Sequence, residues 1–160
     1  MEKNIMLGLE VAMLCLLFGA LTHAQTGECN KKRKCPIDVY FTIDTSETIA
    51  LQESPPGSLV ESIKQFVEQF VSRLKDEEIK GSVQITWKTG GLHFSKKQVI
   101  ISSIGSMPDF LTRLKPIRYL GNGTYIDCAI KKMTSEMLAA PQESSSHSTL
   151  RFGVIITDGH

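Results

Sequence analysis

The chain has 160 residues, of which 41% are hydrophobic and 22% charged, and its formal net charge is +1. This composition is typical of one globular domain. The near-neutral charge indicates no nucleic acid or other polyanionic partner.

Residues 1–24 carry the pattern of a secretory signal peptide. Lys3 supplies a basic start, Val11 to Leu21 form an apolar core, and a small-residue site precedes a predicted cut before Gln25. An N-terminal membrane anchor is the alternative, but the apolar stretch is shorter than the roughly 20 residues that span a bilayer. We therefore expect a secreted protein without a membrane anchor.

Secretion makes the cysteines disulfide candidates. Cys15 leaves with the signal peptide, so Cys29, Cys35 and Cys128 remain. An odd number implies a free thiol, an intermolecular bridge or a missing partner. For Cys128, at a predicted helix start, a small buried thiol is an equally good interpretation.

The first elements after the signal peptide are a linker, a strand and a helix. Residues 25–36 form a polar, basic lead-in, which we interpret as a solvated linker. The apolar run Ile37 to Ile43 predicts a buried strand. Ser58 and Glu61 form a capping box, and apolar residues at helical spacing after it predict an amphipathic helix of about five turns.

The middle of the chain predicts an antiparallel pair of strands and a short helix. Apolar and polar residues alternate over 83–87, which is typical of a strand. Gly90-Gly91 is expected to turn the chain into a second strand over 98–101. A short helix is expected from Pro108, with Ser106 as its N-cap.

The last part of the chain predicts a helix and a second parallel strand. The glycine loop 120–124 leads into a helix whose apolar stripe runs from Ile126 to Met137. A Ser-rich exposed loop over 142–149 follows, and then a buried strand over 152–156. This alternation predicts a Rossmann-like α/β fold with a central, mostly parallel sheet flanked by helices.

Polar oxygens follow both predicted parallel strands. The first strand ends in Asp44-x-Ser46-x-Thr48 and the last in Asp158, while Thr124 closes the glycine loop between them. The carboxyl ends of parallel strands meet at one edge of a sheet, where ligands bind. Oxygen-only ligands suit Mg²⁺, with Ca²⁺ or Mn²⁺ left open. As alternatives, these residues are turn formers, with Thr124 a helix N-cap partnered by Asp127.

These motifs resemble the von Willebrand factor A domain over residues 35–160. The stretches 44–47, 90–95, 123–130 and 155–160 are similar to the N-terminal A domain of type VI collagen chains. The resemblance implies a metal ion-dependent adhesion site built by Asp44, Ser46, Thr48, Thr124 and Asp158. The family usually has Ser where this chain has Thr48. Because a complete A domain continues with further strands and helices, we expect a partial domain.

The resemblance also implies a function outside catalysis. It indicates a non-enzymatic module of the extracellular matrix, whose partners are matrix proteins and other collagen chains. The alternative is a secreted haloacid dehalogenase-like phosphohydrolase that uses Asp44 as nucleophile, although Ser46 replaces the second acid of such enzymes. No catalytic residue is assigned.

Two smaller expectations concern the surface. Asn122-Gly123-Thr124 is an N-glycosylation sequon. Either it is unused, or a glycan on Asn122 shields the metal face, and we expect it to be unused. His93, His147 and His160 have no spacing that indicates ligation, and surface positions are expected for them.

Overall fold

The structure is a computed structural model that describes residues 33–141 and 149–158. The predicted signal peptide, Cys29, most of the Ser-rich loop and His160 lie outside the described residues. Among the described residues, no helix is long and apolar enough to cross a membrane. The strands are β1 (Arg33–Asp44), β2 (Glu77–Ile79), β3 (Val83–Phe94), β4 (Gln98–Gly105) and β5 (Leu150–Ile156). The helices are α2 (Glu47–Leu51), α3 (Ser58–Arg73), α4 (Met107–Leu114) and α5 (Ile126–Ala139).

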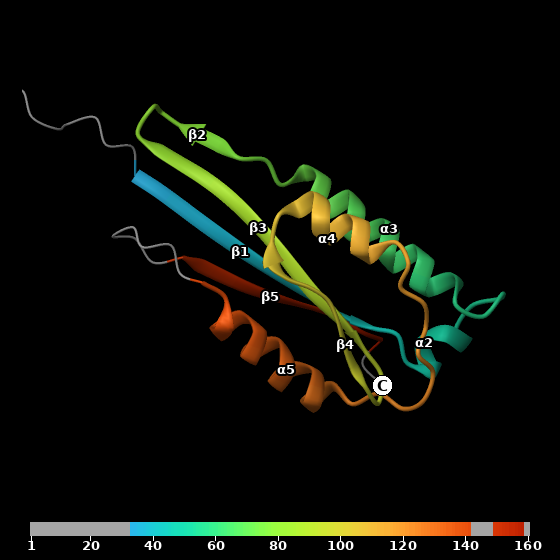
Figure 1. The fold of residues 1–160 in the computed structure, drawn as a ribbon. Coiled ribbons are helices and arrows are strands. Elements are labelled where there is room, and N and C mark those ends of the chain that lie inside the picture. Colours follow the sequence, from blue (N-terminus) through green and yellow to red (C-terminus); the bar gives the residue numbers. More distant parts are fainter. Residues whose placement is uncertain (1–32, 142–148, 159–160) are drawn as a thin grey trace, which may run out of the picture. The chain divides into compact units, whose positions relative to one another are not determined.

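The strands form one sheet with β1 at its centre (Figure 1). β1 pairs in parallel with β3 on one side and with β5 on the other. β2 and β4 pair antiparallel with β3, so the predicted α/β fold with a central, mostly parallel sheet is confirmed. β1 begins four residues earlier than predicted, because Arg33 to Pro36 pair with the first residues of β3.

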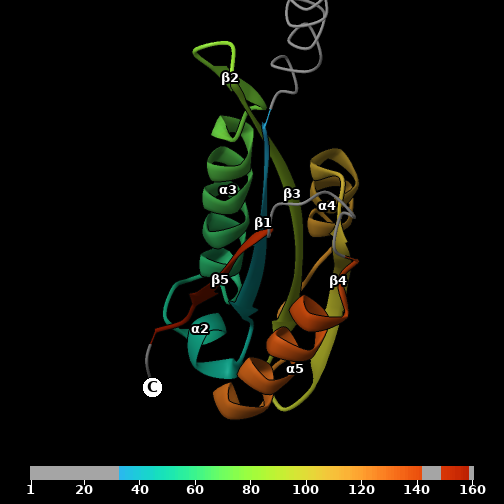
Figure 2. The same cartoon turned by 90° about the vertical axis from the view of Figure 1, so that its left-hand side faces the viewer.

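Helices cover both faces of the sheet. Phe41 faces α3 and α4; its ring stacks on Phe110 at 5.5 Å and meets Phe70 edge-on at 5.9 Å. Tyr40 faces the other way and packs with Ala129 and Met133 of α5. Figures 1 and 2 show α3 and α5 on opposite sides of β1. The alternation of side chains along one buried strand therefore builds two separate apolar layers.

The predicted turn at Gly90-Gly91 is wrong. β3 runs through both glycines and ends at Phe94, and the chain turns at Ser95 to Lys97 instead. A Cβ on Gly91 would lie 2.6 Å from the Phe41 carbonyl oxygen, and one on Gly90 would lie 2.8 Å from the Ile104 nitrogen. These glycines allow close backbone approach within a strand, where the register with β4 also shifts.

Two helix starts also differ from the prediction. α3 is preceded by Gly57 with φ 90°, and the Ser58 hydroxyl donates to Glu53, so the capping box is absent. α5 follows Tyr125, which makes no side-chain cap. By contrast, the Ser106 hydroxyl accepts from the Asp109 N–H at 3.3 Å, which confirms the cap predicted for the short helix α4.

Candidate functional site

Asp44 ends β1 and joins it to the end of β5. Its side chain is fully buried. Oδ1 accepts the backbone N–H of Ser46 at 2.9 Å, and Oδ2 accepts the Thr157 hydroxyl at 2.8 Å. Both carboxylate oxygens thus accept a hydrogen bond, and Asp44 holds the Ser46 turn against the sheet.

Three hydroxyl groups form a triangle beside this carboxylate. The Ser46 Oγ lies 2.9 Å from the Thr48 Oγ1 and accepts from the Thr124 Oγ1 at 3.0 Å. The Thr48 and Thr124 oxygens are 3.4 Å apart. Ser46 is buried, Thr124 is half-buried and Thr48 is exposed, so the triangle opens toward solvent on one side. We call these three side chains the hydroxyl triangle.

The loop before α5 is fastened to the end of β1, and this fixes Thr124. The Leu120 N–H donates to the Thr45 carbonyl at 2.8 Å, and the Glu47 N–H donates to the Asn122 carbonyl at 2.9 Å. Gly121 and Asn122 both have left-handed backbone, with φ of 67° and 63°, which Gly and Asn adopt most readily. Thr124 bonds to Ser46, and α5 is preceded by Tyr125, so the N-cap interpretation of Thr124 is wrong.

Asp158 lies beyond β5 and contacts the other end of α2. Its Oδ2 accepts the side-chain amide of Gln52 at 2.8 Å. The hydroxyl triangle includes Ser46, immediately before α2, so this short helix connects the predicted acid to the triangle. The structure therefore brings Asp44 and the hydroxyl triangle into one hydrogen-bonded cluster, with Asp158 tied to it through Gln52.

The donor set suits a small hard cation. Neighbouring ligands of an octahedral Mg²⁺ shell lie about 3.0 Å apart when each metal–oxygen bond is about 2.1 Å long. The hydroxyl triangle has edges of 2.9, 3.0 and 3.4 Å, so it matches one face of such a shell. The described residues contain no group of three or more His, Cys, Asp or Glu that could hold a metal. The fit therefore rests on neutral hydroxyl oxygens, with Asp44 behind them.

The cysteines do not gather in the same way. Cys35 and Cys128 are both free thiols. Cys35 lies nine positions before Asp44 on β1, about 30 Å away along the strand, whereas Cys128 lies in the first turn of α5, just after Thr124. A bridge between these two is therefore absent. The Cys128 thiol is half-buried and lies 3.8 Å from Asp127.

His93 is buried, so its predicted surface position is wrong. The side chain is 6% exposed, and burial lowers the pKa of His93 to about 4. Its Nδ1 lies 3.1 Å from the hydroxyl of Thr45, and that hydroxyl also lies 3.1 Å from the Phe94 carbonyl oxygen. In the sequence, the position of His93 between the apolar residues Leu92 and Phe94 could have indicated a buried side chain.

Comparisons with known proteins identify the family of this chain. The sequence profile of the von Willebrand factor type A domain matches residues 38–160. The collagen alpha-2(VI) chain of Gallus gallus is 46% identical over 154 residues, covering 92% of this chain. The collagen alpha-1(VI) chains of Mus musculus and Homo sapiens are 37% and 35% identical, covering 79% and 93% of this chain. This chain spans 12–15% of the length of these relatives.

Solved structures support the fold alone. An aerotolerance-related membrane protein from Bacteroides fragilis superposes with a TM-score of 0.59 at 23% identity, covering 77% of this chain and 54% of the other. The protein BatB from Bacteroides thetaiotaomicron superposes with a TM-score of 0.52 at 21% identity, covering 72% and 52%.

Proposed function

Because this chain belongs to the von Willebrand factor type A domain family, we propose that it is an interaction module of the extracellular matrix. Its partners are matrix proteins and other collagen chains, the class to which its collagen VI relatives belong. Binding depends on a divalent cation held by Asp44, Ser46, Thr48, Thr124 and Asp158. The observation that carries the proposal is the hydroxyl triangle at the exposed edge of the sheet.

The site residues have distinct roles in this proposal. The hydroxyl triangle supplies neutral oxygens, and Thr48 supplies one despite its additional methyl group. Asp44 orients Ser46 through the backbone N–H and provides negative charge behind the triangle. Asp158, oriented by Gln52, provides the second carboxylate. When bound, the cation supplies an electrophilic centre that accepts a carboxylate from the partner.

Mg²⁺ is the first cation to test, and Ca²⁺ and Mn²⁺ stay open. Ca²⁺ takes 6–8 oxygen ligands at 2.3–2.6 Å. Its neighbouring ligands therefore lie more than about 3.0 Å apart, and it needs more donors. Two edges of the hydroxyl triangle, 2.9 and 3.0 Å, are close to the separation for Mg²⁺, whereas the third, 3.4 Å, is wider. Titration with Mg²⁺, Mn²⁺ and Ca²⁺ ranks the three cations directly.

The proposal includes passage through the secretory pathway. Residues 1–24 are proposed as the signal peptide and 25–36 as a basic, Cys-containing lead-in to the domain. N-terminal sequencing of the secreted chain should begin at Gln25. Asn122 is proposed to stay unmodified, so treatment with a peptide N-glycosidase should leave the mass of the secreted chain unchanged.

The test measures binding of the full secreted chain to immobilised type I and type VI collagen, with Mg²⁺ or with EDTA. We expect Mg²⁺-dependent binding that Ser46→Ala and Thr124→Val abolish. Thr134→Val is the matched control, because its hydroxyl bonds only within α5, to the Ile130 carbonyl. Equal binding in EDTA, or full binding by Ser46→Ala, would contradict the proposal.

A further inference from the structure

A groove lies near the proposed cation site. Its volume is about 690 Å³, and it lies between the start of α3 and the loop 115–124. Its walls include Pro55, Pro56, Gly57, Arg118 and Tyr119. None of these residues belongs to the proposed cation site. The groove is thus a second surface feature of the same end of the domain.

Tyr119 lies on the surface beside the groove. It is 51% exposed, so part of its ring is accessible to a partner. A Cβ on Gly57 would lie 3.6 Å from the ring, and one on Gly121 would lie 3.8 Å from it. The ring therefore lies over a surface that two glycines with left-handed backbone leave free of side chains. Because a tyrosine side chain has only two rotatable angles, ordering it on binding costs little conformational entropy.

Arg118 places a positive charge at the edge of the groove. Its side chain is 81% exposed, and its ion pair with Glu61 is long, at 3.9 Å. Glu61 already receives Lys64 on both carboxylate oxygens at 2.9 Å. Glu61 also lines the groove, but Lys64 holds its carboxylate more closely than Arg118 does, so the charge of Arg118 is the less compensated one. A carboxylate is the complementary group for it.

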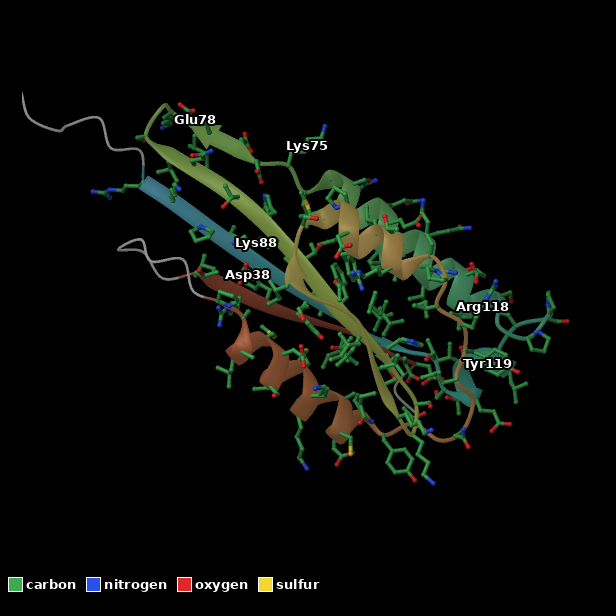
Figure 3. The ribbon with its side chains drawn as sticks, viewed as in Figure 1. Asp38, Lys75, Glu78, Lys88, Arg118 and Tyr119 are labelled. Carbon is green, nitrogen blue, oxygen red and sulfur yellow. The ribbon has the colours of Figure 1, made fainter. Side chains whose placement is uncertain are left out.

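The groove and the hydroxyl triangle flank the same loop. Four residues separate Tyr119 from Thr124, and two of them, Leu120 and Asn122, bond to the end of β1 and the start of α2. Figure 3 shows Arg118 and Tyr119 beside the start of α3, while Lys75 lies beyond its other end. A partner segment that contacts the hydroxyl triangle and extends along the loop therefore reaches the groove.

We propose that this groove binds an extended acidic segment of the partner, with one carboxylate on Arg118 and apolar groups against Tyr119 and the two prolines. The inference rests on the proposed function, because the same partner offers another carboxylate to the cation. Arg and Tyr are the residue types that most often dominate binding energy at interfaces. Aromatic-lined grooves also dock extended, proline-containing segments.

The test uses two short fluorescein-labelled peptides, one of alternating proline and glutamate and the other of alternating proline and glutamine. Both favour the extended polyproline conformation and differ only in charge. Fluorescence polarisation with the full secreted chain is measured in Mg²⁺ and in EDTA. We expect the glutamate peptide to bind in EDTA and more tightly in Mg²⁺, and the glutamine peptide to bind more weakly in both.

Three variants separate the groove from the cation site. Arg118→Glu and Tyr119→Ala should weaken binding of the glutamate peptide by about tenfold in EDTA and in Mg²⁺, while Mg²⁺ affinity measured by calorimetry is unchanged. Lys75→Glu makes the same charge change at an exposed remote position, and it should bind as the unaltered chain does.

Each remaining outcome decides between the two proposals. Equal binding of both peptides, or undiminished binding by Arg118→Glu, overturns the groove proposal while leaving cation binding intact. If the glutamate peptide binds in EDTA but no more tightly in Mg²⁺, the cation proposal alone is overturned and the groove proposal is supported. A loss in Lys75→Glu as large as in Arg118→Glu shows nonspecific attraction and overturns the groove proposal.

Discussion

Arg151 of β5 and Asp38 of β1 form an ion pair that is almost entirely shielded from solvent. The Arg151 Nε lies 3.3 Å from the Asp38 Oδ2, and the two side chains are 15% and 4% exposed. The same guanidinium donates to the carbonyls of Met137 at 2.6 Å and Ala140 at 2.9 Å. One side chain therefore joins two neighbouring strands to the end of α5.

Removing either partner of this pair should destabilise the domain. Arg151→Ala leaves the Asp38 carboxylate buried without compensation and frees two carbonyls at the end of α5, so we expect a loss of about 3–5 kcal/mol. Arg151→Lys keeps the charge but cannot reach all three acceptors, and should lose less. Urea denaturation followed by circular dichroism measures the difference. Arg113→Ala is the control, because its pair with Asp109 is exposed at 60% and 55% and should contribute less than about 1 kcal/mol.

Gly91→Ala should destabilise the domain through a clash inside β3. A Cβ there would lie 2.6 Å from the Phe41 carbonyl oxygen and 3.0 Å from the Phe110 ring, so the sheet or the α4 contact must shift. Overpacking of this kind costs about 1–3 kcal/mol. Gly105→Ala is the control, since its Cβ would meet only the Ser103 carbonyl, at 3.8 Å. Equal urea midpoints for the two variants would contradict the packing argument.

Thr48 provides a paired test of the hydroxyl triangle. Thr48→Val keeps the side-chain shape but removes the oxygen that lies 2.9 Å from Ser46, so Mg²⁺ affinity should fall by at least about tenfold. Thr48→Ser keeps the oxygen and should bind within about twofold of the unaltered chain. Isothermal titration calorimetry gives both affinities. If Val and Ser at this position bind Mg²⁺ equally, Thr48 is not a ligand.

The fold was predictable where it depends on hydrophobic periodicity and on the order of strands and helices along the chain. The apolar runs after Pro36 and before Thr157 lie side by side as the parallel strands β1 and β5. The stripe before Arg73 forms α3, although Phe66 and Phe70 stay 54% and 39% exposed. A one-dimensional pattern indicates which residues are apolar, but not which of them another element covers.

The errors arose where a residue's role depends on distant segments. Glycine is a turn former in local sequence, yet Gly91 is required by the approach of Phe41 and Phe110, which lie far away in the chain. Gln52 and Thr157 orient Asp158 and Asp44, and nothing in their local sequence indicated it. The candidate site residues could be predicted because each of their motifs follows a recognisable strand or precedes a recognisable helix.

The buried histidine predicts a pH dependence of stability. Because burial lowers the pKa of His93 to about 4 in the folded state, the unfolded chain, with a pKa near 6.5, binds more protons between these two values. Stability from this group is therefore fully present above about pH 6.5 and is lost as the pH falls toward 4. Between pH 7 and pH 5 the loss should be about 2 kcal/mol.

His93→Asn isolates this contribution, because carboxyl groups that titrate near pH 4 stay unchanged in the variant. The amide occupies the same buried position and keeps a hydrogen-bonding partner for the Thr45 hydroxyl, but it does not titrate in this range. Urea midpoints at pH 7 and pH 5 should therefore differ less for His93→Asn than for the unaltered chain. An identical pH dependence in both would show that His93 is protonated equally in the folded and unfolded states, contrary to its burial.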